Sequence, residues 1–138
     1  MAEIAIGRED RLSAQEFLDI LHRSGLAERR PVGDLERIAA MLEHANLFIC
    51  ARDVGSRLIG VSRCATDFAY FCYCADLAVD KAYQSQGIGR RLLDATRAEL
   101  HPQATLYLIA APAAVSYYQH IGMTRHDRCF AFLPETKV

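Results

Sequence analysis

Residues 68–100 constrain the fold more than any other part of this sequence, because an apolar segment leads through a glycine-containing loop directly into a helix. Residues 68–79 (FAYFCYCADLAV) form the most apolar stretch of the chain, and Asp76 is the single charge within it. A stretch of this length and composition predicts a central strand that is covered on both faces. Residues 87–100 predict a helix, which ends before Pro102 because proline cannot continue a helix.

The loop between this strand and this helix has the properties of an anion-binding site. Gly87 and Gly89 stand where the helix begins, and a glycine lets the backbone approach a ligand without a Cβ in the way. The first helical turn also leaves N–H groups unpaired and carries the positive end of the helix dipole. Arg90 and Arg91 lie in that turn, where cations are unfavourable to the helix. Either an anionic ligand or a solvated surface accounts for them.

Spacing and composition exclude several other classes of binding protein. A dinucleotide-binding GxGxxG loop requires Gly or Ala at position 92, where this chain has Leu92, and the Gly-Lys-Ser/Thr of a P-loop is absent. The net charge of -1 provides no overall field that would attract nucleic acid or an anionic membrane. The sequence contains no run of 18 apolar residues, so it predicts no transmembrane helix. We therefore expect neither a nucleic-acid partner nor a membrane partner.

Together with the strand at 68–79 and the helix at 87–100, the remaining segments predict the order βααβββαβαβ. Residues 3–7 alternate like a strand, and Ser13 with Glu16 begins a helix that ends at Gly25. Asp34 caps a second helix that reaches about His44. The later segments are a hairpin of residues 47–52 and 57–65, a strand at 105–110, a short helix at 113–121 ending at Gly122, and a strand pair at 123–133. This order indicates a single α/β domain, residues 1–138, with helices on both faces of a mixed sheet.

The five cysteines predict free thiols. They are odd in number and the N-terminus has no secretory signal, so we expect a reducing cytoplasm rather than a disulfide framework. Cys72 and Cys74 are separated by one residue, which is not a usual spacing for metal ligands. We interpret them as buried strand cysteines and expect no metal.

Two motifs give the chain a resemblance to a known family. Gln84-x-x-Gly87-x-Gly89 resembles the acetyl-CoA signature (Q/R)xxGx(G/A) of the GNAT superfamily, and residues 114–123 (AVSYYQHIGM) resemble its A-x-x-(F/Y)-Y-x-x-x-G-F segment. The resemblance covers residues 47–133 well and the preceding residues only in layout. It implies an α/β (α+β) fold with a mixed, mostly antiparallel sheet of six to seven strands, helices on both faces and splayed central strands. Ala111 departs from the asparagine that many members have, so a hydrogen bond to the pantetheine arm is missing or supplied elsewhere.

The resemblance also implies an activity and a cosubstrate. The chain is expected to be an acetyl-CoA-dependent N-acetyltransferase that moves the acetyl group to a primary amine by direct attack in a ternary complex. The acceptor is an amine-bearing small molecule, peptide or protein. The residues expected to bind acetyl-CoA are Leu77, Ala78, Val79, Gln84, Ser85, Gln86, Gly87, Ile88, Gly89, Arg90 and Tyr117. A non-catalytic acyl-CoA-binding sensor is the alternative.

Tyr118 resembles the family's general acid by its position. A phenol, with a pKa of about 10, is suited to protonate a departing thiolate, whose thiol has a pKa of about 8.5. The alternative is that Tyr118 only packs on the cofactor. Asp76 is either a general base acting through a water or a structural anchor for a neighbouring loop. Tyr70 and Tyr73 either line the acceptor pocket or belong to the core.

The C-terminal region raises the question of assembly. Residues 129–133 are apolar enough to form a strand that pairs across a homodimer.

Overall fold

The computed structural model describes residues 3–135, and it divides into a larger unit that ends at Leu108 and a smaller unit that begins at Ile109. The larger unit contains a five-stranded sheet in the order β1-β2-β3-β4-β5. Its strands are β1 (Ala5–Glu9), β2 (Leu47–Arg52), β3 (Leu58–Thr66), β4 (Phe71–Val79) and β5 (Thr105–Tyr107). The first four strands pair antiparallel, and β5 pairs with β4 in parallel.

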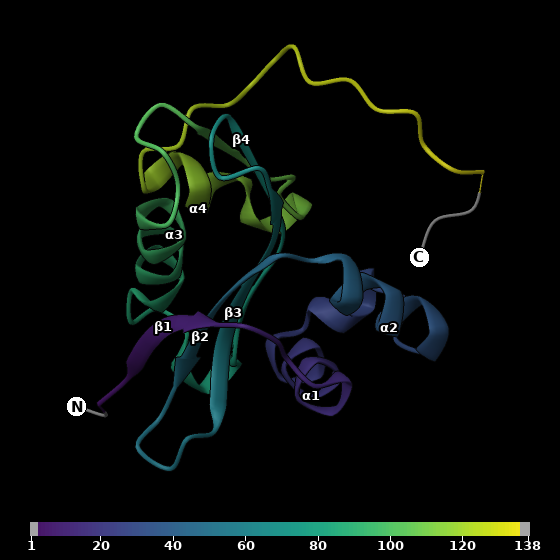
Figure 1. Cartoon of the computed structure of the whole chain (residues 1–138), viewed down its shortest axis with the longest axis vertical. Coiled ribbons are helices and arrows are strands. Elements are labelled where there is room, and N and C mark those ends of the chain that lie inside the picture. The colour runs from purple at the N-terminus through teal and green to yellow at the C-terminus, as the bar shows by residue number, and fades with distance from the viewer. Residues whose placement is uncertain (1–2, 136–138) are drawn as a thin grey trace. The chain divides into compact units, whose positions relative to one another are not determined.

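Helices cover both faces of this sheet. They are α1 (Ala14–Ser24), α2 (Leu35–His44) and α3 (Ile88–Ala98), with short 3₁₀ helices η1 (Leu26–Arg29) and η2 (Lys81–Tyr83). Figure 1 shows α3 on one side of the strands and α1 with α2 on the other. The predicted mixed α/β sheet with helices on both faces is therefore confirmed. None of the helices within residues 3–135 combines the length and the apolar character needed to cross a bilayer.

Side-chain caps explain where the first two helices begin. The Ser13 hydroxyl accepts a hydrogen bond from the Glu16 N–H at 3.1 Å, and the Asp34 carboxylate accepts one from the Arg37 N–H at 3.2 Å. Each cap satisfies one of the N–H groups that a helix leaves unpaired at its start. Gly25 ends α1 with a φ of 87°, a left-handed conformation that glycine adopts without steric cost. The predicted start points of both helices are confirmed.

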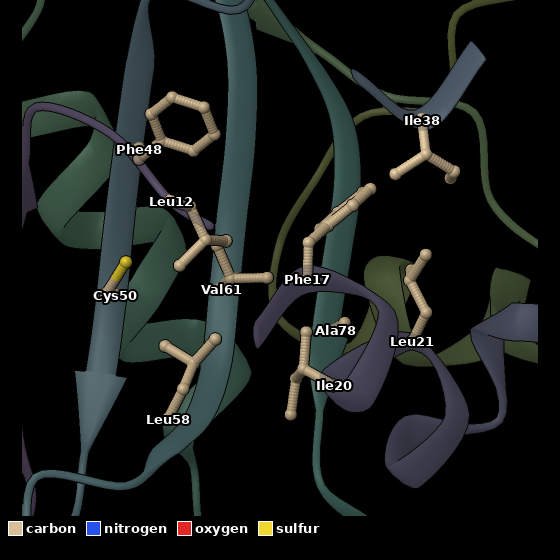
Figure 2. Close-up of a cluster of buried hydrophobic side chains, with 10 residues drawn as sticks. All are labelled: Leu12, Phe17, Ile20, Leu21, Ile38, Phe48, Cys50, Leu58, Val61 and Ala78. Atoms are coloured by element: carbon tan, nitrogen blue, oxygen red, sulfur yellow. The ribbon is translucent and has the colours of Figure 1, made fainter. Parts of the chain in front are cut away.

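The main hydrophobic core lies between α1 and the sheet. Figure 2 shows Phe17, Ile20 and Leu21 of α1 in one buried cluster with Val61 and Ala78 of the strands. Leu12, Ile38, Phe48, Cys50 and Leu58 complete the buried cluster. Burying one large apolar side chain stabilises the fold by about 1.5–3 kcal/mol relative to leaving it in water. This core holds α1 firmly against β3 and β4.

A β-bulge in β4 changes which of its side chains point to each face of the sheet. The register pairs Arg63 with Asp76 but the next residue, Cys64, with Cys74, so Ala75 is an extra residue in β4. A bulge of this kind reverses the alternation of side chains beyond it. Cys74 therefore lies on the α3 face, whereas Asp76 lies on the α1 face.

The expectation that β4 is covered on both faces was wrong in part. Phe71 and Tyr73 keep 40% and 38% of their surfaces exposed. On the side away from β3, β4 has only the three-residue β5 beside it. The strand also begins at Phe71 rather than Phe68, because the Asp67 carboxylate accepts hydrogen bonds from the N–H groups of Ala69, Tyr70 and Phe71 and holds a bend there.

The smaller unit consists of the 3₁₀ helix η3 (Pro112–Ala114), the helix α4 (Val115–His120) and an extended tail. Gly122 has a φ of 94° after α4, as expected for a left-handed helix end. The predicted strand pair at residues 123–133 was wrong, since the structure assigns no strand between Met123 and Glu135. The polar run Arg125 to Arg128 interrupts this segment, and an isolated two-stranded hairpin is only marginally stable. The sheet consequently has five strands among the described residues rather than six to seven.

Candidate functional site

The loop between β4 and α3 folds back onto the end of its own strand. Asp80 follows β4, and its carboxylate accepts a hydrogen bond from the Ala82 N–H at 2.8 Å to begin η2. The Gln84 side-chain amide then donates to the Val79 carbonyl oxygen at 2.9 Å. Ser85 and Gly87 have φ values of 67° and 79°, so the chain turns twice through left-handed conformations before α3 begins. These contacts give the loop a defined shape.

The first turn of α3 begins with backbone N–H groups that have no partner within the helix. The first hydrogen bond along this helix runs from the Arg91 N–H to the Gly87 carbonyl oxygen at 3.1 Å. The N–H groups of Ile88, Gly89 and Arg90 precede it and have no carbonyl one turn earlier in the helix. A Cβ built on Gly87 would have no heavy atom of residues 3–135 within 4 Å, so these residues leave room at this position. The loop therefore fits an anionic group such as a diphosphate.

The side chains in this turn contribute differently. The Ile88 side chain is buried, so its part in binding is limited to its backbone. The Arg90 Nε lies 3.8 Å from the Asp94 Oδ1, and both side chains are exposed. Arg91 donates to the Ile4 carbonyl oxygen at 3.4 Å. Neither arginine is held in a buried ion pair by these contacts, and an exposed pair of the Arg90–Asp94 kind contributes little to stability.

The outer edge of β4 is open beyond its short pairing with β5. The parallel ladder ends at Tyr73 and Tyr107, and no other strand of residues 3–135 joins this edge. The Asp80 N–H donates to the Ile59 carbonyl oxygen, which makes Gly60 and Val79 a non-hydrogen-bonded pair. The N–H and C=O of Val79 therefore point away from β3, toward the open edge. The predicted splay of the central strands is confirmed within the larger unit.

The same alternation distinguishes the residues of this strand end. Leu77 is two residues from Val79 and opposite Ser62, so its backbone polar groups also face the open edge. Ala78 is opposite Val61, and its backbone groups face β3. Leu77 and Val79 are thus the residues that can pair with an extended ligand. Ala78 was named with them from the sequence, but its hydrogen-bonding groups are directed into the sheet.

Asp76 is the most strongly held charge in the sheet. It is 1% exposed, its Oδ1 accepts from the Arg30 Nε at 2.5 Å, and its Oδ2 accepts from the Arg63 Nε. Arg30 comes from the segment between η1 and α2, so the carboxylate ties that segment to β4. With both oxygens engaged by arginines, the geometry favours the structural anchor over the general base.

The tyrosines that were assigned to the acceptor side occupy two environments. Tyr73 is half-buried, and burial raises the pKa of its phenol although the Arg30 guanidinium opposes this effect. The charge of Asp76 also raises that pKa, and the charge of Arg63 lowers it. Tyr70 is largely exposed in the bend before β4. Their roles toward an acceptor stay predictions.

The tyrosines of α4 lie in the smaller unit. The rings of Tyr117 and Tyr118 pack edge to face, with centroids 5.3 Å apart and an interplanar angle of 71°. The roles of Tyr118 as the general acid and of Tyr117 as a cofactor contact stay predictions.

Sequence reasoning missed the arginines that hold the β4 strand end, namely Arg23, Arg30 and Arg63. A single charge in an apolar strand does predict a buried partner of opposite sign. The sequence contains 16 lysines and arginines, however, and nothing in their spacing identifies the partner.

Comparisons with known proteins agree with this geometry. A family model described as "Acetyltransferase (GNAT) domain" matches residues 22–132. A Glycine max protein named "Probable acetyltransferase TAP2" is 31% identical over 106 residues, which are 68% of this chain and 42% of that protein. The chain therefore belongs to the GNAT acetyltransferase family, and it spans less than half the length of this curated relative.

Solved structures show the same fold at low sequence identity. The GNAT family protein SP0256 from Streptococcus pneumoniae TIGR4 is 20% identical, with a TM-score of 0.77 over 97% of this chain and 98% of that chain. The aminoglycoside N-acetyltransferase AAC(6')-Iy in complex with CoA is 14% identical, with a TM-score of 0.70 over 99% and 97% of the two chains.

Proposed function

We propose that this chain is an acetyl-CoA-dependent N-acetyltransferase that moves an acetyl group to a primary amine by direct attack in a ternary complex. The observation that carries the proposal is the left-handed glycine turn at Gly87, which precedes the N–H groups that α3 leaves unpaired at its start. The CoA complex of the structural neighbour AAC(6')-Iy supports a coenzyme A ligand.

Two parts of the larger unit suit two parts of the cosubstrate. The N–H groups of Ile88, Gly89 and Arg90 suit the diphosphate, because unpaired amides and the helix dipole both favour negative charge. The outward backbone groups of Leu77 and Val79 suit the amide-containing pantetheine arm, which would extend the sheet as a further strand does. Gln84, Ser85 and Gln86 form the turn that brings the helix start next to this strand end. Tyr117 is assigned to cofactor contact through the family motif.

The cosubstrate supplies an activated acetyl group, and the chain supplies orientation and proton transfer. An outward N–H at the end of β4 would polarise the thioester carbonyl, an oxyanion-type contribution. Tyr118 would donate its phenolic proton to the sulfur as the C–S bond breaks, and the proton that the attacking amine loses would restore the phenol. Asp76 is assigned to anchoring rather than to proton abstraction, because both of its oxygens already accept from arginines.

The acceptor is an amine-bearing small molecule, peptide or protein. The name of AAC(6')-Iy identifies an aminoglycoside N-acetyltransferase, which supports an amine as the acceptor group. Tyr70 and Tyr73 are the side chains that we assign to the acceptor side. The charges of Arg30 and Asp76 both act on the pKa of the Tyr73 phenol.

The test is to incubate the purified chain with acetyl-CoA and a panel of primary amines while measuring free thiol and coenzyme A binding. Binding with amine-dependent thiol release supports the enzyme. Binding without release from any amine supports the acyl-CoA sensor, for which Ala111 in place of the family asparagine is the sequence argument. Absence of binding would contradict both functions.

We also propose that the chain forms a homodimer through its C-terminal tail. Phe130, Phe132 and Leu133 are exposed along one extended segment, and clustered exposed apolar side chains mark association surfaces. A dimer by sedimentation that becomes a monomer in Phe130→Ser/Phe132→Ser supports this assignment, and a monomeric native chain contradicts it.

A further inference from the structure

Two buried carboxylates bracket the strand end that we assign to pantetheine. Asp76 precedes Leu77, and Asp80 follows Val79. Each carboxylate is paired with an arginine from the same region of the chain. The Arg30 Nε lies 2.5 Å from the Asp76 Oδ1, and the Arg23 Nη1 lies 2.5 Å from the Asp80 Oδ2.

Arg23 fixes the C-terminal end of the strand segment 77–79. It lies in the last turn of α1 and also donates to the Leu58 carbonyl oxygen at 2.5 Å and to the Asp19 carboxylate at 2.9 Å. One guanidinium thereby joins α1, the start of β3 and the residue directly after β4. Burial raises the pKa of the Asp80 carboxyl, but the Ala82 N–H and Arg23 outweigh it, so this pKa lies below its usual range. The carboxylate is thus held in its charged form.

Arg30 fixes the N-terminal end of the same segment, at the bulge. Besides its bond to Asp76, it donates through Nη2 to the carbonyl oxygen of Ala75 at 2.8 Å. Ala75 is the extra residue that re-aims the second half of β4. Arg63 holds the other oxygen of Asp76 and donates to the Met41 carbonyl oxygen at 3.0 Å, which connects α2 to the same point.

Stability alone does not account for buried ion pairs at these two places. Taking charges out of water offsets much of their mutual attraction, so apolar side chains of similar size often stabilise a fold equally well. Planar guanidinium groups with several hydrogen bonds do, however, fix the direction of the backbone they contact. The backbone between the two pairs has an open outer edge, where no strand of residues 3–135 restrains it.

We propose that Arg23 and Arg30 are positioning residues, which hold Leu77 and Val79 in the orientation that pairs with the pantetheine arm of acetyl-CoA. This inference rests on the proposed function. It assigns α1 and η1, which pack on the sheet side of Asp76 and Asp80, a second role. They set the geometry of the open strand edge as well as contributing to the fold.

The experiment compares Arg23→Met and Arg30→Met with Arg52→Met as the matched control. The Arg52 side chain is 22% exposed, as is that of Arg30, and it pairs with two carboxylates, Glu9 and Glu16. It belongs to β2, so its removal tests the loss of an ion pair away from β4. Arg23→Lys and Arg30→Lys keep the positive charge without the planar fork, and they serve where a methionine variant does not fold.

The first measurement is amide hydrogen exchange in the absence of ligand. We expect the amides of Ala78 and Asp80, which face β3 and alternate with Leu77 and Val79, to exchange faster in the Arg23 and Arg30 variants, and the amides of β4 to remain unchanged in Arg52→Met. This readout does not depend on the proposed activity. Equal exchange at Ala78 and Asp80 in all variants and the native chain would overturn the inference.

The second measurement is coenzyme A affinity together with kinetics. We expect kcat/KM for acetyl-CoA to fall by about 100-fold in the Arg23 and Arg30 variants, because small displacements of a binding group have effects of this size. Arg52→Met should lower the melting temperature and leave kcat/KM unchanged. If the native chain binds coenzyme A and the Arg23 and Arg30 variants behave like Arg52→Met, only this inference fails. If the native chain does not bind coenzyme A, the proposed function itself fails.

Discussion

The side-chain amide of Gln84 donates to the carbonyl oxygen of Val79 at 2.9 Å, which joins the first residue of the glycine motif to the last residue of β4. The glutamine of the motif therefore stabilises the turn by a hydrogen bond within the loop. Since the Val79 carbonyl already accepts this bond, the outward groups that best suit pantetheine are the Val79 N–H and the polar groups of Leu77.

Gln84→Ala should destabilise the loop and weaken cofactor binding. The loss of one hydrogen bond of this kind costs about 0.5–1.5 kcal/mol in the free energy of unfolding. Urea unfolding and calorimetric titration with coenzyme A measure the two effects. Gln103→Ala, an exposed glutamine in another loop, is the control. An unchanged affinity for coenzyme A in Gln84→Ala would remove Gln84 from the site.

Gly87→Ala should be harmful through backbone strain rather than through a clash. Gly87 has a φ of 79°, and a left-handed conformation costs a residue with a Cβ about 1–2 kcal/mol. Among the described residues, no heavy atom lies within 4 Å of the position that a Cβ would take, so the added methyl group enters the space that we assign to the ligand. Lower stability and lower coenzyme A affinity are both expected, by urea unfolding and by calorimetric titration. Gly33→Ala, at a site with equally open surroundings, should change neither.

Tyr118→Phe should lower kcat with little effect on coenzyme A affinity. The phenolic proton is needed only when the thiolate departs, and general acids contribute about 100- to 10,000-fold. We expect a decrease of about 10- to 1,000-fold in steady-state kcat, near that range. Tyr117→Phe, on the same helix, is the matched control and should retain its kcat. Unchanged turnover in Tyr118→Phe would exclude Tyr118 as the acid.

Alkaline pH should destabilise the fold through Cys50. Burial raises the pKa of this thiol from 9.0 to about 12, with a further contribution from Glu9. The native state therefore retains a proton that the unfolded chain loses above pH 9. The stabilisation is complete below pH 9 and is lost as the pH rises toward 12. At pH 10 the loss from this group is about 1.4 kcal/mol. Urea unfolding at pH 8 and pH 10 should show a smaller decrease in Cys50→Ala than in the native chain.

Thiol reagents should distinguish one cysteine from the others. Cys50, Cys64, Cys72 and Cys74 are buried, whereas Cys129 is exposed. A chromogenic disulfide reagent should therefore modify one thiol in the native chain and five after denaturation, since the sequence contains five cysteines. Cys129→Ser should abolish the native reaction. Rapid modification of a second thiol would contradict the buried packing around the sheet.

Local sequence signals predicted those elements whose ends are set by contacts between residues close together in the chain. Ser13 and Asp34 mark the starts of α1 and α2 because their side chains act on N–H groups three residues away. The turn at Gly87 was predictable for the same reason, since glycine followed by an apolar periodic run is a local pattern. The tail was predicted wrongly because the alternation of Phe130 and Phe132 suggests a strand, whereas a strand also needs a partner that sequence alone does not identify.

The candidate site was predictable as a motif but not as an arrangement. The sequence placed Leu77, Ala78 and Val79 together, and only the strand register separates Ala78, which faces β3, from its neighbours. Asp76 has two interpretations in the sequence, and our assignment of it as an anchor depends on the positions of Arg30 and Arg63. Both partners are distant in sequence, and no periodicity connects an arginine in a loop to a carboxylate in a strand.

The extra residue at Ala75 has a consequence for how this strand can evolve. If β4 were one residue shorter at this point, the parity of every later side chain would change. Asp76 would turn its charge into the packing beneath α3, and its arginines would lose their counterion. Insertions and deletions in β4 are therefore constrained far more than substitutions, and a chain that tolerates a different amino acid at this position will still not tolerate the removal of the position itself.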